Sequence, residues 1–446
     1  MPEQLSLKSE LELAKGSSYG FMSRVQSAFE ENTSVLGSSI KSASSSSEIS
    51  NTNKSVSSQG LFNANPNPNP YLTSAAIVPD FNGDGRTDKI WVDAQTGETQ
   101  IWLMDGTTVI SKGSFPADPN NPPGSIDYKI GDFNGDNKTD FLLRNKVTGA
   151  NTLVLMDGTN FTNLISLDPL DGNWSPFIGD FDGDRKTDIL WRNNTTGENA
   201  IWLVDGSNPI QAIKSGIRLE GLDATWTPTM VDFDGNGVTD IFWRSTTGEN
   251  SAWFFDGTQV NKSSLQSQDA SWTFTLGDFN GDFRSDILWR NTTTGENKAW
   301  LTNSLIPNNV FFTESSLTTL DANWTSSIAD FNGDGKTDVF WRNQATGENT
   351  TWLMDGGTIV TESFLAPSST TAQATFGDFN NDGRTDIYWR EYATGADEIW
   401  ITNADGTTVT RTPIAETERL SPIQVGEDGN PILGPDGTPL KKWVTF

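Results

Sequence analysis

A nine-residue acidic segment recurs seven times along the chain, and this recurrence limits the fold more than any other feature of the sequence. One copy, at 330–338, reads DFNGDGKTD. Self-similarity at a period of 46 to 52 residues is typical of folds built from repeated supersecondary units. The copies begin at Asp80, Asp132, Asp180, Asp232, Asp278, Asp330 and Asp378.

Each repeat carries further residues at fixed distances from its acidic segment. A tryptophan lies eleven residues after the first Asp in six repeats, with Leu143 as the exception, and an arginine follows it in six, with Val92 as the exception. A Thr-Gly turn and, in six repeats, a second tryptophan come next. Sixteen of the 17 tryptophans therefore lie in phase with the repeat.

Short β-rich runs such as DILWR and AIWLVDG, bounded by Gly-containing turns, leave room for four strands in each repeat. Blades of a β-propeller are four-stranded units of this size. A β-helix has a much shorter period, and separate domains of about 48 residues would each bury too little core. The sequence predicts an all-β fold, a seven-bladed β-propeller of four-stranded blades spanning 71–414.

The segments outside the repeats differ from them in composition. Residues 1–70 are rich in serine and predict a non-globular tail, with either no regular structure or a short amphipathic helix at 19–36. Residues 415–446 predict a C-terminal extension. This extension is either a loose tail or an extended strand that docks on the ring or on a neighbouring molecule.

Composition excludes several classes of function. The chain has 58 acidic and 30 basic residues, no histidine and no cysteine, so disulfides, thiol chemistry, zinc-type ligand sets and histidine-based catalysis are excluded. A net charge of −28 argues against nucleic acid as a partner. No apolar run is long enough to span a membrane, and no classical signal peptide is seen.

The acidic segment has the pattern of a calcium-binding loop. In the sixth repeat, oxygen-bearing side chains occupy alternate positions 1, 3 and 5 (Asp330, Asn332 and Asp334), and Asp338 occupies position 9. Such side chains converge on one centre and suit a hard cation with six to eight oxygen ligands. Position 12 lacks the Glu of an EF-hand, so the ligand set closes at position 9. We expect up to seven Ca²⁺ ions, one per blade.

The predicted ligands are the side chains at positions 1, 3, 5 and 9 and the backbone carbonyl at position 7. They are Asp80, Asn82, Asp84, Arg86 and Asp88; Asp132, Asn134, Asp136, Lys138 and Asp140; Asp180, Asp182, Asp184, Lys186 and Asp188; Asp232, Asp234, Asn236, Val238 and Asp240; Asp278, Asn280, Asp282, Arg284 and Asp286; Asp330, Asn332, Asp334, Lys336 and Asp338; and Asp378, Asn380, Asp382, Arg384 and Asp386.

The alternative is that Asp, Asn and Gly only form good turns at these positions. Seven loops with Asp at both positions 1 and 9 favour the metal site over this alternative. Glycine is replaced at position 6 by Asn137, Arg185 and Phe283, and at position 4 by Asn381. We therefore expect affinity to differ among the seven sites.

The segment DFNGDGKTD, with a hydrophobic strand after it, resembles the FG-GAP or VCBS repeat. That family forms the calcium-bearing blades of integrin α-subunit propellers and of a fungal N-acetylglucosamine-binding lectin. The resemblance covers about 340 of the 446 residues. It implies a calcium-binding propeller, and by analogy glycan binding or adhesion.

Three functions remain open from the sequence. The first is a non-enzymatic recognition or adhesion module outside the cytoplasm that binds a glycan or a protein. Its best ligand-binding candidates are Trp174, Trp226, Trp272 and Trp324. Packing between blades is the commoner role of such tryptophans. The second is a structural subunit of a filament, sheath or surface layer that assembles through its tails. The third is an enzyme with a carboxylate pair, which the sequence disfavours because 22 of the 58 acidic residues are assigned to metal and no acidic residue stands out from the repeat pattern as a unique site.

Overall fold

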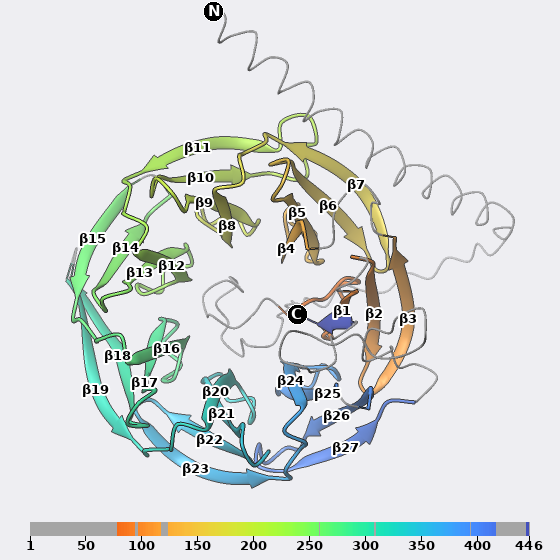
Figure 1. Cartoon of the computed structure of the whole chain (residues 1–446), viewed down its shortest axis with the longest axis vertical. Helices are drawn as coiled ribbons and strands as arrows, with labels where there is room; N and C mark the ends of the chain where they lie inside the picture. The colour runs from red at the N-terminus through yellow and green to blue at the C-terminus, as the bar shows by residue number, and fades with distance from the viewer. Residues whose placement is uncertain are drawn as a thin grey trace, which may run out of the picture.

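A computed structural model describes residues 78–93, 97–116, 124–257, 259–306, 309–392, 394–415 and 443–445. These residues form seven four-stranded antiparallel sheets arranged as the blades of a ring (Figure 1). The prediction of an all-β, seven-bladed propeller is confirmed. The tail at 1–70, with the helix considered at 19–36, lies outside the described residues.

Each blade has four strands, which follow one another from the inside of the ring outward. The blades are β28 (Trp443–Thr445), β1 (Lys89–Asp93), β2 (Thr99–Asp105) and β3 (Thr108–Phe115); β4 (Ile126–Gly131), β5 (Asp140–Asn145), β6 (Asn151–Asp157) and β7 (Asn160–Leu167); β8 (Trp174–Gly179), β9 (Asp188–Asn193), β10 (Asn199–Val204) and β11 (Ile213–Leu219); β12 (Trp226–Val231), β13 (Asp240–Ser245), β14 (Asn250–Phe255) and β15 (Val260–Leu265); β16 (Trp272–Gly277), β17 (Asp286–Asn291), β18 (Asn297–Ile306) and β19 (Asn309–Leu317); β20 (Trp324–Ala329), β21 (Asp338–Asn343), β22 (Asn349–Asp355) and β23 (Thr358–Leu365); and β24 (Ala372–Gly377), β25 (Asp386–Glu391), β26 (Ala396–Thr402) and β27 (Val409–Pro413).

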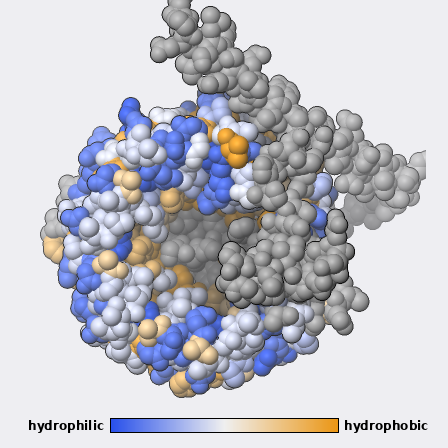
Figure 2. All heavy atoms as spheres, viewed as in Figure 1, coloured by the Kyte–Doolittle hydropathy of each residue, from blue (hydrophilic) through white to orange (hydrophobic). Residues whose placement is uncertain are grey.

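Burial along the strands explains this order. Every residue of the second strands β9, β17 and β21 is buried, because both faces of these strands are covered by neighbouring blades. The outermost strand β3 alternates between exposed and half-buried residues, as expected for a strand with one face in solvent. Among the described residues, no helix has the length and hydrophobicity needed to span a bilayer. The visible face is mostly hydrophilic (Figure 2).

The first blade is completed by the other end of the chain. In blades two to seven the innermost strand leads directly into the acidic loop, but residues 78 and 79, the described residues ahead of the first loop, form no strand. Instead β28, near the C-terminus, pairs with β1 (Figure 1). In this pairing Trp443 lies opposite Asp93. Trp174 occupies the same place in the third blade, opposite Asn193. Of the alternatives for the C-terminal extension, docking on the ring is therefore found for β28.

Neighbouring blades are joined by a stacked arrangement of arginine and tryptophan. The guanidinium of each repeat arginine lies 4.7–5.2 Å from the ring centroid of the first tryptophan in the next blade. That tryptophan packs against the second tryptophan of its own blade at 4.9–5.3 Å. The arrangement closes the ring through Arg390 and Trp91. These repeat tryptophans are therefore core residues.

The exceptions in the repeat fall at one interface. The first blade has Val92 in place of arginine, and the second blade has Leu143 and Val154 in place of the two tryptophans. By register, Val92 lies where the other blades place the guanidinium, and Leu143 where they place the indole. Aliphatic side chains thus take the places of both members of the stacked pair, at an interface whose core also contains Phe81 and Phe141.

Candidate metal centres

The first Asp of each loop orders the loop backbone. In the sixth loop, Asp330 Oδ1 accepts the N–H of Gly333 at 2.7 Å, and its Oδ2 accepts the N–H of Gly335 at 3.0 Å. The Oδ2 contact to the amide at position 6 is present in all seven loops, at 2.7–3.0 Å. Burial raises the pKa of Asp330 to about 6, against the lowering effect of these hydrogen bonds.

The side chains at positions 3 and 5 also fold back on the loop. The position-3 Oδ1 accepts the N–H of position 5, and the position-5 Oδ1 accepts the N–H of position 7, in every loop. Where position 3 is asparagine, its amide can also donate to the position-5 carboxylate, as Asn332 does to Asp334 at 3.1 Å. The predicted side-chain ligands at positions 1, 3 and 5 are thus gathered in one turn.

The ninth-position Asp links the loop to the third strand of its blade. Asp338 Oδ2 accepts the N–H of Phe331 and Oδ1 accepts the N–H of Met354, both at 2.9 Å. The equivalent bonds occur in all seven blades. Burial raises the pKa of Asp338 to about 8, despite these two bonds. Without a bound cation, the charged form of this carboxylate is therefore costly.

Positions 4 and 6 require a left-handed backbone. All glycines at these positions have positive φ, for example Gly333 at 71° and Gly335 at 86°. The non-glycine residues with positive φ in the described part of the chain are Asn137, Arg185, Phe283 and Asn381, which are the four replacements noticed in the sequence. These loops keep the common backbone conformation, although a Cβ in the left-handed region destabilises it.

The residue at position 7 has a role that the sequence interpretation missed. The sequence predicted only a backbone carbonyl ligand at this position, yet the residue is basic in six of the seven loops. The side chain forms ion pairs with an acid of its own loop or of the Asp-Gly turn in the same blade. Lys336 Nζ lies 2.7 Å from Asp355, and Arg86 Nε lies 3.1 Å from Asp105.

Position 8 joins each loop to the preceding one, which sequence reasoning also missed. The N–H at this position donates to the carbonyl of the first Asp in the preceding blade at 2.7–2.9 Å, and Thr87 to Asp378 completes the circle. The Thr337 hydroxyl also accepts the N–H of Asp278 at 2.9 Å. The signal was present in the sequence, because position 8 is Thr in six loops and Ser in the other.

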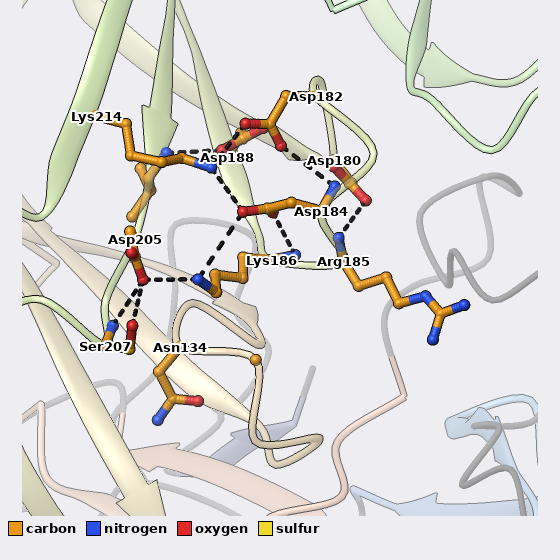
Figure 3. A network of polar contacts seen from close by, with 12 residues as sticks. Asn134, Asp180, Asp182, Asp184, Arg185, Lys186, Asp188, Asp205, Ser207 and Lys214 are labelled. Carbon is orange, nitrogen blue, oxygen red and sulfur yellow. Dashed lines mark hydrogen bonds and ion pairs between the residues drawn. The ribbon is translucent and has the colours of Figure 1, made fainter. Parts of the chain in front are cut away.

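The third loop contains a cation of the protein itself (Figure 3). Nζ of Lys214, from β11, lies 2.6 Å from both Asp182 and Asp184. Carboxylate oxygens of Asp180, Asp182 and Asp184 lie within 4.8 Å of one another, as do those of Asp232, Asp234 and Asp240 in the fourth loop.

The residues present fit a calcium ion. Every side-chain donor in the predicted sets is an oxygen, the donor type that Ca²⁺ prefers. An ammonium already lies between two of these carboxylates in the third loop, so this part of the fold accepts a positive charge. The Asp and Asn side-chain oxygens at positions 1, 3, 5 and 9 would hold the ion, which would supply positive charge to the buried carboxylates.

The four candidate ligand-binding tryptophans lie at the other end of the blades. Each starts an innermost strand, whereas the acidic loop follows the end of that strand. Trp174, Trp226 and Trp324 are half-buried and pack against blade cores, and Trp272 is buried. The metal centres and the tryptophans therefore belong to opposite faces of the disc.

The recurring loop and the strand after it are also what comparison with known families detects. The FG-GAP-like repeat matches at 80–143, 132–191, 180–243, 232–289 and 330–389, which together make up more than half of the chain. The chain belongs to the FG-GAP-like repeat family. The five matches begin at the loop starts of blades one to four and six, the matched ranges contain all seven loop starts, and neighbouring FG-GAP-like matches overlap. No curated protein matches the chain.

One solved structure supports the architecture of this FG-GAP-like propeller. A lectin from Agrocybe aegerita, described as recognising non-reducing terminal N-acetylglucosamine, is similar with a TM-score of 0.58 and 15% identity, over 80% of this chain and 94% of the lectin. A protein from Lactobacillus plantarum gives a TM-score of 0.47 and 8% identity, over 80% of this chain and 99% of that one. At this identity the lectin likeness shows the fold alone.

Proposed function

We propose that the protein is a non-enzymatic, calcium-binding propeller for recognition or adhesion outside the cytoplasm. The observation that carries this proposal is the sevenfold recurrence of one loop, in which side-chain oxygens at positions 3 and 5 fold back on the same turn and the ninth-position carboxylate is buried. A divalent ion would offset the cost of those buried charges and add its binding energy to folding. Extracellular calcium is concentrated enough to fill weak sites.

The proposed ligand is a glycan bound on the face that carries the tryptophan-led strand starts. Trp174, Trp226 and Trp324 each retain partial exposure there, and an indole face can stack on a sugar ring. Exposed hydrogen-bonding groups lie beside Trp174, because the Asn173 side chain precedes it in the chain and its Oδ1 accepts the Thr195 hydroxyl at 3.1 Å. Likeness to a lectin propeller supports this ligand class.

Calcium binding is tested by isothermal titration and by thermal unfolding with calcium or EGTA. Asp334→Asn removes a predicted ligand charge, and we expect it to abolish or weaken one site. Asp355→Asn is the matched control, because this exposed acid pairs with Lys336 beside the same loop but is outside the ligand set. No binding by the wild-type protein, or equal loss in both variants, would contradict the proposal.

Glycan binding is tested on an array of immobilised sugars in calcium. We expect Trp174→Ala, Trp226→Ala or Trp324→Ala to reduce binding of whichever glycan the wild type retains. Trp272→Phe is the control, because this residue starts the equivalent strand but is buried. Failure of the wild type to bind any glycan would overturn the ligand class and leave calcium binding intact.

A further inference from the structure

The third loop differs from its equivalents in charge. It is the only one of the seven acidic segments with Asp at positions 1, 3, 5 and 9 together, namely Asp180, Asp182, Asp184 and Asp188. In the sixth loop, the position-3 asparagine bridges to position 5 by donating its amide N–H. Two carboxylates cannot form that bond, so Asp182 and Asp184 would repel each other without a positive charge between them.

Lys214 supplies that charge from the outermost strand of the same blade. Its ammonium bridges Asp182 and Asp184 at 2.6 Å each, and both carboxylates and the lysine are only partly exposed. Lys186 adds a longer contact of 3.9 Å to Asp184, while its main partner is Asp205 at 2.8 Å. Figure 3 shows Lys214 directed at the loop, whereas the side chain of Arg185 extends away from it.

A β-bulge in β11 aims Lys214 at the loop. The register with β10 shifts between Leu203 and Val204, which leaves Lys214 as the extra residue of the outer strand. The same shift occurs in three other blades, where the extra residues are Ile110, Thr162 and Val360. None of these three carries a charge, so an ammonium at the bulge is specific to the third blade.

We propose that Lys214 acts as a built-in cation of the third loop and competes with Ca²⁺ for Asp182 and Asp184. The inference rests on the proposed calcium binding and refines it. In the first, fifth and seventh loops the position-7 arginine pairs with only the position-5 carboxylate of its loop, whereas Lys214 neutralises the carboxylates at both positions 3 and 5 of the third loop. It is therefore the loop that takes up calcium last and that changes least when calcium is removed.

The test compares wild type with Lys214→Met, which keeps an unbranched side chain one atom shorter and removes the charge. Calcium binding is followed by native mass spectrometry and isothermal titration. An ion entering the wild-type loop must displace two partly exposed ion pairs, which corresponds to roughly a tenfold loss of affinity. We expect the variant to gain one ion of ordinary affinity, or to bind its last ion about tenfold more tightly.

Lys336→Met is the control, because it removes the same charge beside the sixth loop from a lysine whose main partner is Asp355. Thermal unfolding gives a second readout. Lys214→Met should melt at a lower temperature than wild type in EGTA and at the same temperature as wild type in calcium. Identical binding by wild type and Lys214→Met would overturn the competition alone. No calcium binding by any of the three proteins would instead overturn the proposed function.

Discussion

The contact between Arg290 and Trp341 allows a quantitative test of how blades are held together. The guanidinium lies 4.9 Å from the ring centroid of Trp341 in the next blade. It also donates to the carbonyl of Asp321 at 2.6 Å and to Asn297 Oδ1 at 3.1 Å. Both side chains are buried, so solvent screens the contact little.

Arg290→Leu removes the stacking and leaves the Asp321 carbonyl without its donor, which we expect to cost about 2–4 kcal/mol of unfolding free energy. Trp341→Leu removes a fully buried indole and should cost about 2–4 kcal/mol by loss of packing. The double variant reproduces the Val92 and Leu143 interface in kind. The double variant should lose about 1–2 kcal/mol less unfolding free energy than the sum of the two single losses, because either single change already removes the stacking.

The assay is urea unfolding in saturating calcium, followed by circular dichroism and by tryptophan fluorescence. Coincident transitions and equal m-values among the four proteins are required before the free energies are compared. Costs that add to within about 0.3 kcal/mol would refute the reasoning. In that case the arginine would act only through its carbonyl contacts.

Three further outcomes are expected. Deletion of 443–446 should expose the edge of β1, which should lower the melting temperature measured by calorimetry and promote association measured by light scattering. A monomer with an unchanged melting temperature would contradict the closure of the first blade by β28. In EGTA, the free energy of unfolding should fall as pH rises from about 4 to 8, because burial raises the pKa of Asp88, Asp140 and Asp338 from 3.8 to about 8. Over this range the native state holds protons that the unfolded state has lost. Calcium should remove the fall, and a free energy of unfolding that rises with pH would refute the raised pKa values. Phe283→Gly relieves a φ of 70° and should stabilise by up to about 1 kcal/mol in urea unfolding, whereas destabilisation would show that the phenyl ring contributes packing.

The propeller could be predicted because its signals are local and repeated sevenfold. Period, turn residues and strand composition defined four strands per blade, and alternate oxygen side chains defined the loops. What could not be predicted depends on contacts between distant residues. Trp443 was the one tryptophan out of phase, and its place opposite Asp93 becomes visible only when both ends of the chain are placed in one sheet.

The contribution of Lys214 was hidden for a similar reason. It lies 30 residues after Asp184, on a strand whose bulge alone decides where its side chain points. The link at position 8 was readable as a recurring Thr or Ser, but its partner belongs to the preceding blade, 59 residues away in the case of Thr337 and Asp278. Repetition thus reveals which residues recur, and only the closed ring reveals what each one contacts.

The pairing of β28 with β1 also sets an order of events during synthesis. The ribosome releases β1 before the strands of the other six blades and β28 after all of them. The first blade therefore waits, with one edge unpaired, until translation has passed 443–445. A nascent chain halted before that point would leave the edge of β1 unpaired and prone to association, and the cell would have to protect this edge until β28 is synthesised.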